Sequence, residues 1–170
     1  MNRRIEAPWL SASATQAVFA ALEAGGYTVR AVGGIVRNTL LGLPATDIDF
    51  ATNALPAQTM RLAEAAQLKT VATGLAHGTV TVISAGVPFE VTTLRRDVAT
   101  DGRHAQVAFT DDWTADAARR DFTINALYCS RTGEIFDPLQ GVGDLDPVRI
   151  RFIGSAAERI CEDYLRILRF

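Results

Sequence analysis

Apolar positions recur along the chain with two periods, one typical of helices and one typical of strands. Residues 11–24 carry apolar side chains at helical spacing and precede a pair of glycines, which indicates an amphipathic helix with a defined end. Residues 57–66 follow a proline, which is common in the first turn of a helix. Further helices or helical turns are expected at residues 35–41, from residue 111 and through 122–127, and at 140–145. Strands are expected at residues 27–32, 47–51, 69–73, 78–84, 88–93, 107–109, 134–136 and 148–153.

Two stretches depart from this alternation. Residues 95–105 are polar and contain Gly102, so we expect a mobile loop there. From Ser155 the chain keeps a helical period up to its last residue, without a glycine, asparagine or proline stop signal. We therefore expect one continuous final helix, and we expect the chain to be the front part of a longer protein.

Composition limits the functional classes. The chain has 170 residues, of which 48% are apolar and 21% are charged, as in a globular protein with a sizeable core. The net charge of −2 provides no bulk positive field for non-specific nucleic-acid binding. Two cysteines without metal-ligand spacing suit a reducing cytoplasm, and the chain shows neither a signal peptide nor a long apolar run for a membrane span.

Candidate chemistry is concentrated in residues 29–52, where a glycine pair and an arginine precede two aspartates. Asp47 and Asp49 are two apart on an expected strand, so both side chains point to one face, roughly 6–7 Å apart at the backbone. Gly33 and Gly34 allow close approach of an anionic ligand, and Arg37 can bind phosphate. An isolated glycine pair is usually a turn and an isolated DxD a polar strand end, but their adjacency predicts a metal–nucleotide site.

A third carboxylate, Glu90, lies on the strand expected at residues 88–93. In an antiparallel arrangement it faces the aspartate strand; the alternative is a solvated side chain on an edge strand. Two or three carboxylates suit Mg²⁺, which keeps several water ligands. Two such ions, roughly 3.5–4 Å apart, suit in-line phosphoryl or nucleotidyl transfer.

Two further groups of charged residues have candidate roles. Arg119 and Arg120 form an arginine cluster suited to phosphate, and Asn125 lies one helical turn after Asp121; the alternative is an ordinary charged helix end. On the final helix, one side carries charged residues: Glu162, Asp163, Arg166 and Arg169. Its alternative is a surface helix with ion pairs.

An aspartate beside an arginine matches a particular kind of base edge. The carboxylate only accepts hydrogen bonds and the guanidinium only donates them. Cytosine and adenine offer an amino donor next to an unprotonated ring nitrogen, whereas guanine and uracil offer a carbonyl beside a ring N–H. Asp163 with Arg166 is therefore suited to accept CTP and ATP without a template.

Several short motifs occur together in one order: GGIVRN, DIDFAT, EVTTLRRD, DGRH, RRDFTINAL, FDP with GVGDL, and EDYLRILRF. This ordered set resembles class II CCA-adding enzymes (tRNA nucleotidyltransferases), and related bacterial poly(A) polymerases share most of it. The resemblance implies an α+β fold: a DNA polymerase beta-like nucleotidyltransferase head, residues 1–150, with a mixed, mostly antiparallel sheet flanked by helices. Residues 151–170 would begin an all-helical neck, and helices beyond this chain would grip the tRNA.

The resemblance also implies residue roles. Gly34 and Arg37 would contact the triphosphate, and Glu90 would be the third acidic residue beside Asp47 and Asp49, the metal-binding pair. The nucleotide would further contact residues of the later motifs: Arg120, Asn125, Asp163 and Arg166, with Glu162 orienting Arg166 and Arg169 supporting it. Asp101 and Arg103 would belong to a flexible loop linked to the switch from C to A addition.

The implied activity is addition of CMP and AMP from CTP and ATP to the tRNA 3′ end with Mg²⁺, in the cytoplasm. The alternatives are a poly(A) polymerase, a CC-adding or A-adding specialist, and a nucleotide-binding piece without turnover. One departure is Asn38, where the family pattern usually has aspartate; we expect only a modest effect, because asparagine still forms hydrogen bonds.

Overall fold

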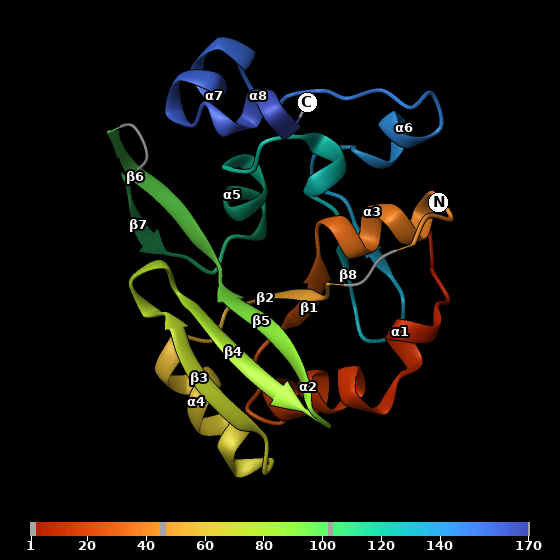
Figure 1. Ribbon diagram of the computed structural model, residues 1–170, viewed down its shortest axis with the longest axis vertical. Coiled ribbons are helices and arrows are strands. Elements are labelled where there is room, and N and C mark those ends of the chain that lie inside the picture. Colours follow the sequence, from red (N-terminus) through yellow and green to blue (C-terminus); the bar gives the residue numbers. More distant parts are fainter. Residues whose placement is uncertain (1–2, 45–46, 102–103, 170) are drawn as a thin grey trace.

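The computed structural model describes residues 3–44, 47–101 and 104–169, with backbone alone for residues 99–101 and 104–106. Helices surround a mixed sheet, and a separate hairpin projects from it (Figure 1). The strands are β1 (Val29–Val32), β2 (Asp49–Thr52), β3 (Lys69–Gly74), β4 (Thr79–Ser84), β5 (Val87–Thr93), β6 (Arg95–Asp101), β7 (His104–Phe109), β8 (Tyr128–Cys129) and β9 (Ile135–Phe136). The helices are α1 (Pro8–Ser11), α2 (Ser13–Glu23), α3 (Gly34–Leu40), α4 (Pro56–Ala65), α5 (Trp113–Ala118), α6 (Val142–Leu145), α7 (Ala156–Glu162) and α8 (Leu165–Arg169), with 3₁₀ turns at Leu75–His77 and Thr123–Asn125.

The main sheet has the strand order β3-β4-β5-β2-β1-β8-β9 among the described residues. Neighbouring strands run antiparallel except β2 and β5, which are parallel. The expected mixed, mostly antiparallel sheet with flanking helices is confirmed. In the parallel pair Asp49 lies directly opposite Glu90. The antiparallel relationship expected between these two strands is therefore wrong, although the adjacency of their carboxylates holds.

The two faces of the sheet have different roles. Phe50 and Phe89 are buried on one face, in the core cluster that α2 and α4 complete, and Phe19 of α2 meets Phe50 edge-on with ring centroids 4.9 Å apart. Because side chains alternate along strands, Asp49 and Glu90 project from the other face and are exposed. Burial of one face thus determines which carboxylates remain available to a ligand.

The stretch expected as a mobile loop forms the two-stranded hairpin β6–β7. Its backbone pairs in antiparallel register from Arg95 opposite Phe109 to Asp101 opposite His104, with an irregularity between Asp97 and Ala99. Cross-strand hydrogen bonds satisfy its backbone, so its polar side chains are compatible with a strand. Arg103 and the side chain of Asp101 lie outside the described residues, and their expected loop role stays a prediction.

Three expected elements also differ from the observed structure: the helix at residues 122–127, the strand at 148–153 and the single final helix. Residues 122–127 contain only a 3₁₀ turn before β8, and within residues 148–153 Phe152 alone forms an isolated bridge, to Phe122. The expected single final helix is divided at Asp163, whose backbone is extended (φ −154°, ψ 104°). The Asp163 carboxylate accepts a hydrogen bond from the backbone N–H of Leu165 at 3.0 Å, so it begins a new helix. Within the described residues, no helix combines the length and apolar character needed to cross a membrane.

Candidate active site

A pocket of about 270 Å³ unites the glycine motif and the aspartate motif. Gly34 and Arg37 come from α3, which starts immediately after β1, and Asp47 and Asp49 come from the entry to β2. Gly33 caps α3 with φ 78°, a left-handed conformation that favours glycine over any residue with a Cβ. The sharp turn after β1 therefore brings phosphate-binding candidates and carboxylates to one opening.

Negative charge accumulates at the end of this pocket. Partial loss of solvent around the Asp49 carboxyl raises its pKa, and the charges of Glu90 and Asp47 raise it further. The positive charge of Arg120 acts in the opposite direction on the same group. Repulsion among carboxylates of this kind is relieved when a cation binds, so the environment of Asp49 fits a metal ligand.

The donor set fits a metal ion that needs few protein ligands. Over the described ranges of the chain, no group of three or more His, Cys, Asp and Glu side chains is arranged to hold a metal ion. Glu90 therefore does not complete a ready-made three-carboxylate site. Asp47 and Asp49 nevertheless supply the oxygens that Mg²⁺ prefers, and this ion takes its other ligands from water and substrate phosphates.

Arg37 is held by two amide side chains. Its Nε donates to Oδ1 of Asn38 at 3.0 Å, and its Nη1 donates to Oδ1 of Asn125. Nδ2 of Asn38 donates to the carbonyl oxygen of Pro44 at 2.9 Å, and Pro44 also lines the pocket. Asn38 thus orients the arginine and holds Pro44, and it makes the contact with Arg37 without the negative charge that an aspartate would bring.

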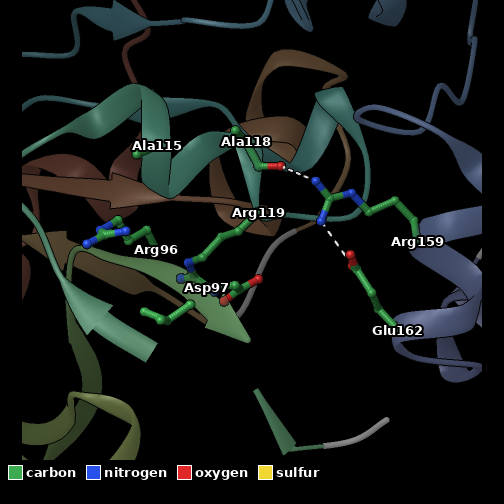
Figure 2. Close-up of a pocket in the computed structure, with 8 residues that line it drawn as sticks. Arg96, Asp97, Ala115, Ala118, Arg119, Arg159 and Glu162 are labelled. Atoms are coloured by element: carbon green, nitrogen blue, oxygen red, sulfur yellow. Dashed lines mark hydrogen bonds and ion pairs between the residues drawn. The ribbon is translucent and has the colours of Figure 1, made fainter. Parts of the chain in front are cut away.

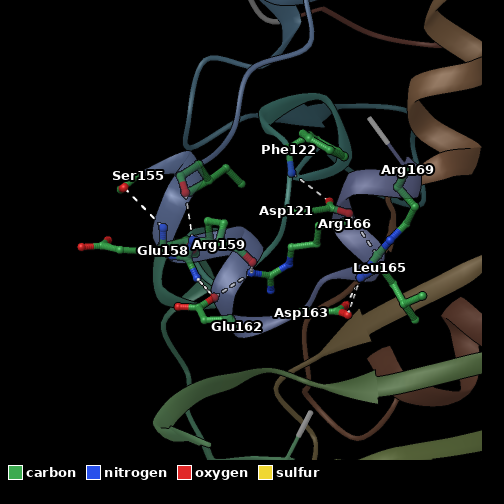
Figure 3. Close-up of polar contacts among 12 residues, drawn as sticks. Asp121, Phe122, Ser155, Glu158, Arg159, Glu162, Asp163, Leu165, Arg166 and Arg169 are labelled. Atoms are coloured by element: carbon green, nitrogen blue, oxygen red, sulfur yellow. Dashed lines mark hydrogen bonds and ion pairs between the residues drawn. The ribbon is translucent and has the colours of Figure 1, made fainter. Parts of the chain in front are cut away.

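The polar contacts continue from Arg37 to α8, and Figure 3 shows the part of them around Asp121, Asp163 and Arg169. Nδ2 of Asn125 donates to Oδ1 of Asp121 at 3.0 Å, as expected for residues four apart, although a 3₁₀ turn replaces the expected α-helix. Arg169 donates to Oδ2 of Asp121 at 3.0 Å and to Oδ2 of Asp163 at 2.7 Å. Residues far apart in sequence therefore form one continuous polar network.

The pairing within this network differs from the pairing expected on a single helix. Arg166 donates to Glu162 at 2.6 Å and to the carbonyl oxygen of Arg159, as predicted for a glutamate that orients the arginine. Asp163 pairs with Arg169 instead of Arg166. The extended backbone at Asp163 breaks the helical spacing that would have placed Asp163 and Arg166 side by side.

A second pocket, of about 440 Å³, lies between β6, α5 and α7 (Figure 2). Arg96, Arg119, Arg159 and Glu162 contribute polar walls. Arg159 donates to the carbonyl oxygen of Ala118 at 2.8 Å and to Glu162 at 3.0 Å. The bond to Ala118 holds α7 against the end of α5, and the bond within α7 fixes Glu162 next to the segment that carries Arg120.

The sequence interpretation missed Asp116, the buried partner of both arginines in the Arg119-Arg120 pair. Its carboxylate lies 2.9 Å from Nη2 of Arg119 and 3.1 Å from Nη2 of Arg120. The spacing of three and four residues was a signal for these ion pairs. Burial of the aspartate, which makes loss of its partners costly, is not visible in the sequence.

Comparisons with known proteins agree with this architecture. The chain matches the family described as "Poly A polymerase head domain" over residues 29–151. It is 48% identical over 145 residues to the mitochondrial CCA tRNA nucleotidyltransferase 1 of Mus musculus, covering 85% of this chain and 33% of that protein. It is 40% identical over 158 residues to the CCA-adding enzyme of Lactiplantibacillus plantarum, covering 92% and 38%. The chain thus spans roughly a third of the length of these curated relatives.

Solved structures of CCA-adding enzymes and tRNA nucleotidyltransferases are also similar to this chain. The crystal structure of the Bacillus stearothermophilus CCA-adding enzyme in complex with CTP matches with a TM-score of 0.84 at 36% identity, covering 97% of this chain and 38% of that one. A tRNA nucleotidyltransferase complexed with a primer tRNA and an incoming ATP analog matches with a TM-score of 0.71 at 28% identity, covering 89% and 42%. Since the family match covers more than half of the sequence, the chain belongs to the poly A polymerase head domain family.

Proposed function

We propose that the protein adds CMP and AMP, from CTP and ATP, to the 3′ end of tRNA without a template. The observation that carries this proposal is the pocket in which Gly34 and Arg37 face Asp47 and Asp49. Phosphate-binding groups beside two exposed carboxylates suit transfer of a nucleotidyl group. The relatives named as CCA-adding enzymes support the choice of reaction.

In the proposed reaction, the tRNA 3′-hydroxyl attacks the α-phosphorus of the nucleotide, pyrophosphate leaves and the hydroxyl proton passes to solvent. Arg37, oriented by Asn38 and Asn125, binds the triphosphate, and Asp47 with Asp49 would hold Mg²⁺. When bound, Mg²⁺ neutralises phosphate charge and stabilises the attacking and leaving oxygens. The remaining contribution of the protein is positioning of the two substrates.

Asp163 and Arg166 retain hydrogen-bonding capacity for a base. Each Asp163 oxygen receives one bond, from Leu165 N–H and from Arg169, and a carboxylate oxygen has two lone pairs. The contacts of Arg166 to Glu162 and Arg159 use Nη1, so its Nη2 and Nε have no partner among the residues that the structure describes. Both side chains can therefore still contact a base, and the proposed selection of cytosine and adenine rests on their acceptor and donor chemistry rather than on an Asp163–Arg166 pair.

Support for the substrates comes from the related structures that hold CTP, or a primer tRNA with an ATP analog. The test uses the full-length protein, Mg²⁺, a tRNA lacking its terminal CCA and each of the four nucleoside triphosphates, followed by sequencing of the product. We expect C, C and A to be added in that order from CTP and ATP alone. Incorporation of UTP or GTP at comparable rates, or no incorporation, overturns the proposal.

A poly(A) polymerase is the second candidate, because the matching family carries that name. Product length separates the two reactions: CCA addition stops after three nucleotides, whereas a poly(A) polymerase makes long A tails. Products ending in CC or containing only an added A identify the partial specialists. Binding of CTP and ATP without incorporation identifies a nucleotide-binding protein.

A cytoplasmic location stays a prediction from cysteine usage.

A further inference from the structure

Five hydrogen bonds converge on the buried carboxylate of Asp116, which lies outside the pocket of Asp47 and Asp49. The side chain of Asp116, on α5, is 1% exposed. Oδ1 accepts from Nε and Nη2 of Arg119 at 3.1 and 2.9 Å and from the backbone N–H of Arg95 at 3.3 Å. Oδ2 accepts from Nη2 of Arg120 at 3.1 Å and from the hydroxyl of Tyr128 at 2.8 Å. These donors occupy the full capacity of the group.

The charge of Asp116 is maintained despite its burial. Burial alone raises the pKa of this carboxyl, but the charges of Arg120 and Arg119 and the hydrogen bond from Tyr128 outweigh it and lower the pKa. A buried, ionised carboxylate with such partners fixes their geometry, because removing it leaves the arginines without a counter-charge. Asp116 is thus a rigid electrostatic anchor.

One of its partners connects it to the proposed active site. Arg120 is 20% exposed, and its partner Tyr128 lies opposite Val32 of β1, which in turn lies opposite Asp49 of β2. Nε of Arg120 donates to the Tyr128 hydroxyl at 3.3 Å, and the guanidinium lies 5.4 Å from the centre of the Tyr128 ring. Asp116 and Tyr128 together hold Arg120 by its guanidinium, and Tyr128 belongs to the row of the sheet that contains Asp49.

Two further contacts surround Asp116, one through the ring of its partner Tyr128 and one through the backbone of Arg95. The ring of Tyr128 meets that of Trp113, at the start of α5, edge-on with centroids 5.4 Å apart, and the guanidinium of Arg30 lies 4.1 Å from the centre of the Trp113 ring. The backbone N–H of Arg95 belongs to the first residue of β6. The anchor therefore joins α5, β8 and the root of the hairpin.

We propose that Asp116 is a positioning residue that holds Arg120 in place for the incoming nucleotide and joins it to the root of the β6–β7 hairpin. The inference rests on the proposed function and on the nucleotide contact that the resemblance of the RRDFTINAL motif implies for Arg120. Asp116 itself touches no substrate and acts through Arg120.

The test compares Asp116→Asn with a destabilising control, Leu22→Ala, in the full-length protein. Leu22, on α2, is buried in the core cluster that contains Phe19 and Phe50. Both variants are expected to lower the melting temperature. Only Asp116→Asn is expected to raise the Kd for ATP, by about ten-fold, the size of one lost bond to a charged group. Leu22→Ala should leave the Kd per folded molecule within about two-fold of the unaltered protein.

A double-mutant cycle that combines Asp116→Asn with Arg120→Gln tests whether Asp116 acts on ATP binding through Arg120. If Asp116 acts through Arg120, the double variant binds ATP no more weakly than Arg120→Gln alone. Additive losses, or an unchanged Kd in Asp116→Asn, overturn the inference. Because binding is measured separately from incorporation, a protein that binds ATP but transfers nothing refutes the proposed function and still decides the role of Asp116. An unaltered protein that binds no ATP overturns both.

Discussion

Arg169 Nη1 lies 3.0 Å from Oδ2 of Asp121, a residue 48 positions earlier in the chain. The other terminal nitrogen of the same guanidinium lies 2.7 Å from Oδ2 of Asp163. Asp121 in turn receives a hydrogen bond from Asn125, which accepts one from Arg37. A single side chain on α8 therefore connects the proposed base-reading residue with the proposed triphosphate pocket.

Replacing Arg169 with glutamine is expected to weaken nucleotide binding more than it weakens the fold. The Arg169 side chain is 51% exposed, so its ion pairs contribute about 1 kcal/mol or less to the free energy of unfolding. Loss of its contacts frees Asp163 and α8, so the Kd for CTP and ATP is expected to rise roughly five- to ten-fold. Isothermal titration gives the Kd, and thermal melting gives the stability.

The matched control for Arg169→Gln is Arg131→Gln. Arg131 is 41% exposed, pairs with Glu23 at 3.2 Å and contacts Gln16, away from the pocket of Asp47 and Asp49. We expect a similar small loss of stability and an unchanged Kd. Equal changes of Kd in the two variants would contradict the role of Arg169.

Replacing Asp163 with asparagine is expected to relax the choice of nucleotide. An asparagine amide both donates and accepts, so it can also pair with the carbonyl groups of uracil and guanine. We expect the preference for CTP and ATP over UTP and GTP to fall by about ten-fold or more, as the ratio of kcat/KM values. The measurement is single-nucleotide incorporation with each triphosphate; unchanged ratios would refute the base-reading role.

Replacing Asp47 with alanine is expected to abolish transfer and preserve the fold. Asp47 is exposed and lines the pocket, so its removal leaves the core intact but takes away a carboxylate for Mg²⁺. We expect a loss of turnover on the order of 10³-fold or more, measured by incorporation of labelled AMP, with an unchanged circular dichroism spectrum. The control is Asp111→Asn, an exposed aspartate outside the pocket; retained turnover in Asp47→Ala would sink the assignment.

Replacing Asn38 with aspartate is expected to change turnover only modestly, within about three-fold. The new carboxylate still accepts the hydrogen bond from Arg37 Nε, but it loses the bond that Asn38 donates to the carbonyl oxygen of Pro44. The measurement is the steady-state rate of nucleotide incorporation by Asn38→Asp and by the unaltered protein. A rise by orders of magnitude would show that asparagine impairs the natural site.

Local features of the sequence predicted much of the fold and the main pocket. The helix expected at residues 57–66 and the strand at 69–73 are present within a residue or so, as α4 and β3, because proline placement and β-branched residues act over short distances. The approach of Gly34 to Asp47 and Asp49 was also predictable, since few residues separate them. The family relationship follows from the order of motifs.

Long-range pairing decided the rest. The sequence alone placed Asp47, Asp49 and Arg37 in one short segment, because strand alternation and a glycine turn depend on neighbouring residues. Only the tertiary structure placed Glu90 opposite Asp49 in a parallel register. It also buried Asp116 among its arginines, because burial depends on which distant surfaces pack together, and no periodicity within one segment specifies that contact.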